Sequence, residues 1–266
     1  MTVPIRTILI TGAAQGVGLA TAGLLAQREC RVILVDIQSV EQQVAQLQSG
    51  GLHAEGMCGD VSSEEFVQQL AQRVSRDYGA LDGLVNNAGI SLIMPAEETT
   101  AAQWQRVMAV NLFAPFLLCR HLGAQMLARR RGSIVNVASV AGLAGISHRS
   151  AYNTSKHGLV GLTKTLAAEW GGRGVRVNAV CPGWIKTEMD AVDQARGTYS
   201  DTDIIDRVPM ARFAKPQDVA EAIAFLLDSD RNGFINGITL PVDGGWMADG
   251  SWNSLRLSTR DPAKGP

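Results

Sequence analysis

Thr11-Gly12-Ala13-Ala14-Gln15-Gly16-Val17-Gly18 connects an apolar run at residues 7–10 to a helical pattern that continues through residue 25. In a strand–turn–helix unit of this kind, Gly12 permits the tight turn and Gly16 lets the backbone approach a pyrophosphate. Gly18 allows the helix to pack close to the strand, and the positive end of the helix dipole faces the phosphates. These eight residues therefore predict a dinucleotide-binding turn, with Gln15 and Val17 as further contacts.

Outward from this turn, strand-like runs rich in Val, Ile and Leu alternate with helical patterns along the chain. Near-continuous apolar strands separated by crossover helices are typical of a parallel sheet that is covered on both faces. We therefore expect an α/β fold, a single-domain doubly wound parallel sheet over residues 1–248, followed by a C-terminal extension at 249–266. The expected strands are residues 7–10, 31–35, 53–57, 81–85, 133–137, 175–180 and 238–241.

Composition narrows the classes of partner. The 266 residues are 46% apolar and carry a formal net charge of -1, which gives no electrostatic reason to expect nucleic-acid binding. We find no signal segment and no apolar run of about 18 residues, so we expect a cytoplasmic protein without a membrane partner. The four histidines lack metal-ligand spacing, so no metal site is expected. Cys30, Cys58, Cys119 and Cys181 lie far apart and are interpreted as reduced core cysteines.

Asp36 ends the second predicted strand, eighteen residues after Gly18. A carboxylate there can accept hydrogen bonds from the two ribose hydroxyls of a dinucleotide, and it would repel a 2′-phosphate. Neither Gln15 nor Ile37 supplies the cation that a phosphorylated ribose requires. The sequence therefore favours NAD over NADP.

Two short segments after the next strands are further candidates for the adenosine half of the cofactor. Asp60 and Val61 can meet the adenine, although Asp60 could equally cap the helix that begins near Ser63. Asn87, Ala88 and Gly89 would lie beside the adenine ribose. The asparagines of this segment could also tie strand ends together, and both interpretations can hold at once.

Tyr152 and Lys156 are four residues apart, and Ser139 lies thirteen residues before Tyr152. Positions i and i+4 share a helix face, so the lysine ammonium would lie beside the phenol and lower its pKa by Coulomb attraction. A tyrosine so placed can act as a general acid or base, and a serine hydroxyl can hold the developing alkoxide. A lone YxxxK pair often arises by chance, and the nucleotide-binding features favour the functional interpretation.

The joint pattern is more specific than its parts. In order, the chain has the TGxxxGxG turn, Asn86-Asn87-Ala88-Gly89, Ser139, the YxxxK pair and Pro182-Gly183. In this order and spacing it closely resembles the short-chain dehydrogenase/reductase family over residues 6 to about 246. The resemblance implies a Rossmann-type domain that transfers a hydride between a nicotinamide and an alcohol or ketone carbon.

The resemblance also implies roles for individual residues. Tyr152 would be the general acid/base, Ser139 would position the substrate oxygen, and Lys156 would tune the tyrosine and bind the nicotinamide ribose. Asn111 would hold a water of the proton relay. Pro182, Gly183, Ile185 and Thr187 would form the segment that cradles the carboxamide. The helix that starts near Thr99 and the helix that carries Tyr152 have broad faces of Ala, Leu and Val. In relatives such faces pair between subunits, so a homotetramer is expected.

The sequence indicates the substrate less clearly than it indicates the type of reaction. Ser91, His148, Glu188 and Asp190 are hydrogen-bonding candidates near the pocket, and they favour a small polyol or sugar. Residues 187–212 are expected to be a long loop that acts as a lid.

Two alternatives to this function stay open. A 3-oxoacyl thioester (acyl-carrier-protein) reductase would use the arginines at 129–131 as a dock for an acidic carrier, although a solvated helix end explains them as well. An NAD-sensing binding protein is the non-enzymatic alternative. Trp246 and Trp252 are expected to bury against a neighbouring subunit or the pocket rim.

Overall fold

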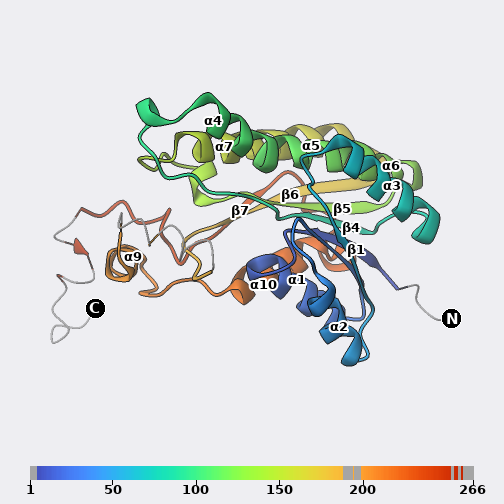
Figure 1. The fold of residues 1–266 in the computed structure, drawn as a ribbon. Coiled ribbons are helices and arrows are strands. Elements are labelled where there is room, and N and C mark those ends of the chain that lie inside the picture. Colours follow the sequence, from blue (N-terminus) through green and yellow to red (C-terminus); the bar gives the residue numbers. More distant parts are fainter. Residues whose placement is uncertain (1–4, 188–193, 195–198, 253–254, 257–258, 260–266) are drawn as a thin grey trace.

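The computed structural model describes residues 5–187, 194, 199–252, 255–256 and 259. Seven parallel strands form one sheet in the order β3-β2-β1-β4-β5-β6-β7 (Figure 1). The predicted doubly wound α/β fold is confirmed, and each predicted strand is found within a residue or two of its expected position. The strands are β1 Thr7–Thr11, β2 Arg31–Asp36, β3 Ala54–Cys58, β4 Gly83–Asn86, β5 Gly132–Val137, β6 Val175–Pro182 and β7 Thr239–Val242.

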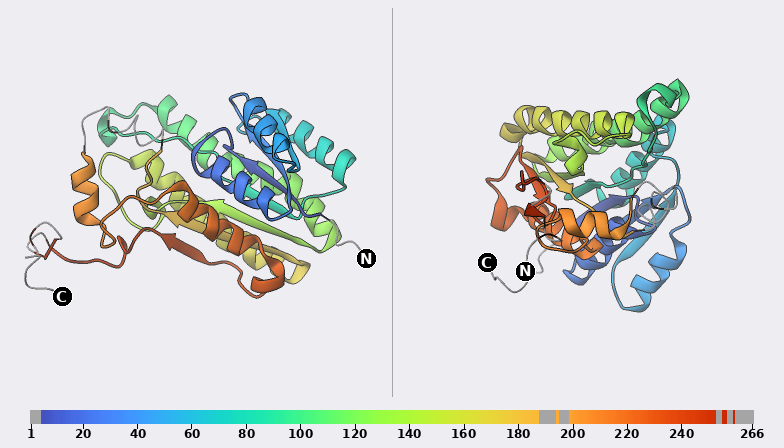
Figure 2. Two further views of the ribbon diagram at one scale, coloured as in Figure 1. Left: turned by 90° about the horizontal axis from the view of Figure 1, so that it is seen from below. Right: turned by 90° about the vertical axis from the view of Figure 1, so that its left-hand side faces the viewer.

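Helices cover both faces of the sheet, as Figures 1 and 2 show from three directions. One face carries α1 (Gly16–Gln27), α2 (Glu41–Ser49) and α10 (Pro216–Leu227). The other carries α3 (Glu64–Tyr78), α4 (Ala101–Met108), α5 (Ala114–Leu118), α6 (Ala124–Arg129) and α7 (Ser150–Trp170). Shorter elements are η1 Ala96–Glu98, the π-turns η2 Ala109–Phe113 and η3 Cys119–Gly123, η4 Val140–Gly142, η5 Gly171–Arg173, α9 Asp201–Arg207 and α11 Ser229–Asn232.

The two apolar layers explain why the strands are apolar almost without interruption. Side chains alternate across a strand, so Ile8 and Ile10 pack with α1 and α10, whereas Leu9 packs with α3 and the α4–α6 helix on the other face. Both layers exclude water, so both sets of positions favour apolar residues. The sheet is thus held rigidly, and its carboxyl edge becomes a fixed platform.

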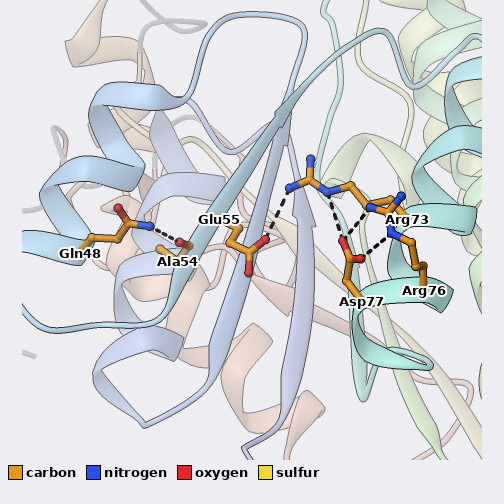
Figure 3. A network of polar contacts seen from close by, with 6 residues as sticks. All are labelled: Gln48, Ala54, Glu55, Arg73, Arg76 and Asp77. Atoms are coloured by element: carbon orange, nitrogen blue, oxygen red, sulfur yellow. Dashed lines mark hydrogen bonds and ion pairs between the residues drawn. The ribbon is translucent and has the colours of Figure 1, made fainter.

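The edge strand β3 is attached by polar contacts at its exposed side (Figure 3). Gln48 of α2 donates to the Ala54 carbonyl at 2.8 Å. On the other side, Glu55 pairs with Arg73 of α3 at 3.4 Å, and Arg73 also lies 3.6 Å from Asp77. Partly exposed pairs of this kind contribute little stability each. Their charges instead make the edge a poor template for pairing with another strand.

One expectation from the sequence needs correction. The helix from Ala101 to Arg129, which comprises α4 to α6 with their π-turns, is long and apolar enough to cross a membrane by length and composition alone. More than half of its most apolar window is buried inside the protein, and Leu117, Leu118 and Leu122 pack against the sheet. The apolar content of this helix is therefore explained by its place in the core.

The segment between β6 and α10 also differs from the expected plain loop, because it contains α9. Arg207 of α9 donates to the Asp249 carboxylate at 2.8 Å, and its guanidinium lies 5.2 Å from the Trp246 ring centroid. The start of the predicted extension is thus attached to α9, beyond the carboxyl edge of the sheet (Figure 1). Trp252 is 71% exposed, and its expected burial against a partner stays a prediction.

Three of the four cysteines are buried as expected, whereas Cys58 is exposed at the end of the edge strand β3. All four are free thiols.

Candidate active site

A cavity of about 440 Å³ opens along the carboxyl edge of the sheet. The strand order places the ends of β3 and β2 at one end of this cavity, β1 and β4 in the middle, and β5 and β6 at the other end. Doubly wound sheets bind ligands in this crevice, where the strand order reverses. The predicted site residues that line the cavity are Gly12, Gln15, Gly16, Val17, Asp36, Ile37, Asp60, Val61, Asn87, Ala88, Gly89, Ser139, Tyr152, Lys156, Pro182, Gly183, Ile185 and Thr187. Gly18 and Asn111 lie behind its wall.

The glycine turn after β1 has the shape that a pyrophosphate requires. Gly12 and Gly16 adopt positive φ angles of 64° and 56°, which side chains with a Cβ rarely tolerate. A Cβ on Gly18 would lie 2.1 Å from the Gly12 carbonyl oxygen and 2.7 Å from the Asn87 amide nitrogen. Gly18 therefore allows α1 to pack against the turn, as predicted, and the bare backbone of Gly12 and Gly16 faces the cavity.

The ends of β1 and β4 are joined by side-chain hydrogen bonds. Asn87 Nδ2 donates to the Thr11 and Gly12 carbonyls, both at 2.9 Å, and the Thr11 hydroxyl accepts from the Ala88 N–H at 3.1 Å. Asn86 Nδ2 donates to the Asn136 side chain at 2.7 Å. The structural interpretation of the asparagines is thus confirmed, and it holds together with the cavity position of Asn87.

The two carboxylates at the adenosine end are held in defined orientations. Asp36 accepts hydrogen bonds from the Ala14 and Gln38 N–H groups, each at 3.0 Å. Asp60 accepts from Ser62 and pairs with Arg106 at 3.1 Å, and these hydrogen bonds lower its pKa although partial burial opposes the shift. Ser63 caps α3 by accepting from the Phe66 N–H, so the alternative role of Asp60 as that cap is wrong.

Tyr152 lies in the first turn of α7, and Lys156 follows one turn later on the same face. Lys156 Nζ lies 5.7 Å from the centroid of the Tyr152 ring and donates to the Val137 carbonyl at 2.8 Å. Val137 ends β5, so the last residue of a central strand fixes where the ammonium sits. The expected lowering of the tyrosine pKa by this charge stays a prediction.

Burial of Lys156 has an effect that the spacing alone does not reveal. The side chain is only 4% exposed, and its removal from water lowers the pKa of Lys156 from 10.5 to about 8, although the nearby Cys181 opposes the shift. The ammonium therefore remains charged at pH 7 but discharges in mildly alkaline solution.

Ser139 and Asn111 flank this pair in different ways. The Ser139 backbone is extended just after β5, and its Oγ accepts from the Ala141 N–H at 3.1 Å, which fixes the hydroxyl at the cavity wall. Asn111 lies in the π-turn η2 and is fully buried. Its amide bonds both backbone groups of Ile90 and also donates to Ser155 Oγ at 3.1 Å. Asn111 thus ties the β4 loop to α7 behind the lysine.

Arg149 and Trp184 are among the cavity residues that sequence reasoning missed. Arg149 is the N-cap residue of α7, three residues before Tyr152 and outside the helix, so helical spacing gave no signal for it. His148, the predicted hydrogen-bonding residue of this loop, is exposed with a φ of 60° and does not line the cavity. Ser91 contacts Arg149, whereas Glu188 and Asp190 lie outside the described residues.

The geometry fits a nicotinamide dinucleotide. A glycine turn without room for side chains, a carboxylate after β2 and a lysine–tyrosine pair after β5 lie along one crevice in that order. Phosphates would meet the N-terminal end of α1, and the ribose hydroxyls would meet Asp36.

Comparison with known proteins agrees with this assignment. Residues 12–247 match the family model described as enoyl-(acyl carrier protein) reductase. The chain is 40% identical over 249 residues to 2-(S)-hydroxypropyl-CoM dehydrogenase 3 of Xanthobacter autotrophicus, covering 91% of this chain and 97% of the relative. It is also 40% identical over 246 residues to D-threitol dehydrogenase of Mycolicibacterium smegmatis, covering 91% and 92%.

A solved structure is similar to the same extent. A putative NAD(P)-dependent gluconate 5-dehydrogenase from Beutenbergia cavernae, with NADP bound at low occupancy, is 38% identical with a TM-score of 0.87. The match covers 92% of this chain and 97% of that one.

The chain therefore belongs to the short-chain dehydrogenase/reductase family, as the sequence pattern predicted. It is an oxidoreductase that uses a nicotinamide cofactor and acts on a secondary alcohol or the corresponding ketone.

The role of Gly18 gives a direct test of the cofactor turn. We expect Gly18→Ala to lower NADH affinity about tenfold or more and to destabilise the fold by about 1–3 kcal/mol, because the new Cβ forces α1 away from Gly12. Gly23→Ala is the matched control on α1, since a Cβ there meets nothing within 4 Å. It should keep NADH affinity and raise stability by up to about 1 kcal/mol. NADH fluorescence titration and urea unfolding measure both quantities, and equal NADH affinity in the two variants would contradict the assignment.

Proposed function

We propose that this chain is an NAD-dependent dehydrogenase of a small polyol or sugar, oxidising a secondary alcohol to a ketone or catalysing the reverse reaction. The observation that carries the proposal is the joint placement of Ser139, Tyr152 and Lys156 at one end of a cavity whose other end holds Asp36. Names of similar proteins support the substrate class, because one acts on threitol and another is a putative gluconate dehydrogenase.

The proposed roles follow from the positions of the side chains. The cofactor supplies the hydride chemistry when bound. Tyr152 removes the proton from the substrate hydroxyl during oxidation and returns it during reduction. Ser139 donates a hydrogen bond to the substrate oxygen, since its Oγ already accepts from the Ala141 N–H. Lys156 provides the positive charge that favours the phenolate, and Asn111 holds the adjoining loop in register.

Preference for NAD rests on Asp36. Its carboxylate lines the cavity and is fixed by two backbone N–H groups, so it can accept from ribose hydroxyls but repels a 2′-phosphate. Arg106 also lines the cavity, but it pairs with Asp60 and donates to Ser62. A similar protein of known structure holds NADP, so family membership does not decide between the two cofactors. The proposed preference for NAD therefore rests on the Asp36 carboxylate of this chain.

A 3-oxoacyl thioester reductase is the second candidate, because the chain is also 38% identical over 249 residues to the 3-oxoacyl-[acyl-carrier-protein] reductase FabG of Thermotoga maritima. The arginines at 129–131 were its expected carrier dock. They precede β5, and Arg129 and Arg131 lie 3.6 and 3.7 Å from Asp82, which precedes β4. This is the amino edge of the sheet, separated from the cavity by the length of β5, so these arginines do not border the active site. The position of these arginines agrees better with a solvated helix end than with a carrier dock.

We also propose that the protein is a homotetramer. Phe113 and Phe116 are 47% and 41% exposed on the helix that contains α5, with ring centroids 6.0 Å apart. Large exposed aromatic side chains that lie together are typical of protein interfaces.

Tyr152→Phe tests the proposed general acid/base. Loss of the hydroxyl should lower kcat at least about 100-fold, while NADH affinity stays within about threefold because the ring remains. Tyr78→Phe, on α3 far from the cavity, is the control and should keep wild-type kcat. Steady-state assays at 340 nm and NADH fluorescence decide, and undiminished turnover by the Tyr152 variant would refute the assignment.

Asp36→Ala tests the cofactor preference. The wild-type protein should use NADH with a kcat/KM at least about tenfold higher than that for NADPH, and the substitution should remove most of this ratio by ending the repulsion of the 2′-phosphate. Comparable kcat/KM values for the two cofactors in the wild-type protein would overturn the preference.

A further inference from the structure

We propose that Arg106 positions the Asp60 carboxylate for recognition of the cofactor's nucleobase, so that the protein selects adenine over a base that carries an oxygen at C6. Arg106 is a positioning residue, because it acts through Asp60. The inference goes beyond the proposed function, since it concerns the adenosine end of the cavity and holds whichever alcohol is the substrate.

The strand order places Asp60 where a nucleobase would lie. Asp36 ends β2, and Asp60 follows β3, the outer neighbour of β2 in the sheet. The Gly59 N–H donates to the Asp36 carbonyl at 2.8 Å and so joins the two strand ends. The glycine turn for the phosphates lies on the opposite side of β2, after β1, so a base attached to a ribose at Asp36 extends toward the end of β3. Gly59, Asp60 and Val61 form that part of the cavity wall.

Arg106 reaches Asp60 from a different part of the fold. It lies on α4, four residues before Val110, and both residues line the cavity. Arg106 Nη1 donates to Asp60 Oδ2 at 3.1 Å and to the Ser62 hydroxyl oxygen at 2.8 Å. This nitrogen carries two hydrogens, so these two bonds use both of them. The guanidinium thus ties α4 to the loop between β3 and α3.

These bonds leave one acceptor position of Asp60 open. Asp60 Oδ1 accepts from the Ser62 N–H at 2.9 Å and from the Ser62 hydroxyl at 2.7 Å. The hydroxyl has one hydrogen, and it directs this hydrogen to Asp60 while its oxygen accepts from Arg106. A carboxylate offers about four acceptor positions, two on each oxygen. Within the described part of the chain, Oδ1 is therefore filled, whereas Oδ2 keeps one position beside Arg106.

The charge of Asp60 decides which base can use this position. Burial opposes ionisation, but hydrogen bonds from Ser62 and the nearby Arg106 charge outweigh it and hold the pKa of Asp60 below its usual value. An ionised carboxylate only accepts, so it can bind the amino group at C6 of adenine and repels the oxygen at C6 of hypoxanthine. The Asp60 and Arg106 side chains are 36% and 48% exposed, so we expect a moderate rather than an absolute selectivity.

Nucleotide binding tests this assignment without turnover. The probes are NADH and its hypoxanthine analogue, titrated by fluorescence. Both carry the same phosphates, so a general loss of positive charge cancels in the ratio of their affinities. We expect the wild-type protein to bind NADH about tenfold more tightly than the analogue, because a hydrogen bond to a charged acceptor is replaced by repulsion. Arg106→Gln should reduce this ratio to below about threefold, Arg106→Lys should keep most of it, and Ser62→Ala should lower it in part.

Arg28→Gln is the matched control. Arg28 pairs with Glu221 at 2.6 Å, with side-chain exposures of 46% and 51%, and neither residue lines the cavity. This variant also loses one partly exposed arginine–carboxylate pair, and it should keep the wild-type ratio.

Equal affinity of the wild-type protein for the two dinucleotides would overturn the inference. A selectivity that survives in Arg106→Gln would overturn it as well, and its loss in Gln38→Ala would then assign the recognition to Gln38, which also lines this end. A loss of NADPH affinity in Arg106→Gln at unchanged selectivity would show that Arg106 serves a 2′-phosphate instead.

The same measurements separate this inference from the proposed function. Arg106-dependent base selectivity in a protein that oxidises no polyol or sugar would leave the inference intact and refute the proposed function. Oxidation of such a substrate with NAD, without selectivity for the base, would do the reverse.

Discussion

The Lys156 ammonium is buried at the carboxyl end of β5, where the Val137 carbonyl accepts its hydrogen bond at 2.8 Å. Water would otherwise stabilise this charge, and burial of the ammonium away from water lowers the pKa of Lys156 to about 8. The sheet imposes this position, because β5 is a central strand with helices packed on both of its faces. The site therefore depends on a cation whose pKa, about 8, lies only a little above neutral pH. Tyr152 can use that cation only because α7 presents both side chains on one face.

A third charged side chain lies beside this pair, at the N-cap position of α7. Arg149 at the start of α7 places a second buried cation near the Tyr152 ring, so the phenol has a positive charge on each side along the helix. One charge is fixed by the sheet and the other by the loop that contains Ser91.

Much of this arrangement could be predicted from the sequence, for reasons that the structure makes clear. The strands were predictable because both faces of the sheet are buried. The glycine turn was predictable because Gly12 and Gly16 have positive φ angles and a Cβ on Gly12 or Gly18 would clash with the neighbouring backbone. Arg149 was missed because a charged residue in a loop is usually solvated, and only the left-handed turn at His148 reverses which side chain faces inward. The helix α9 was missed because its polar turn carries too few apolar positions to show a period, and its single buried residue is Ile204. The apolar window within Ala101–Arg129 was also missed, because Asn111 and Pro115 interrupt its apolar pattern without interrupting the helix.

The most direct test of this account is the pKa of Lys156 itself. In protein labelled with 13C-lysine, the Cε chemical shift should reveal one lysine that titrates near pH 8, and this resonance should be missing from Lys156→Met. If the resonance of Lys156 shows no titration near pH 8, its ammonium is solvated rather than buried beside Tyr152, and the proposed basis of the proton chemistry is contradicted.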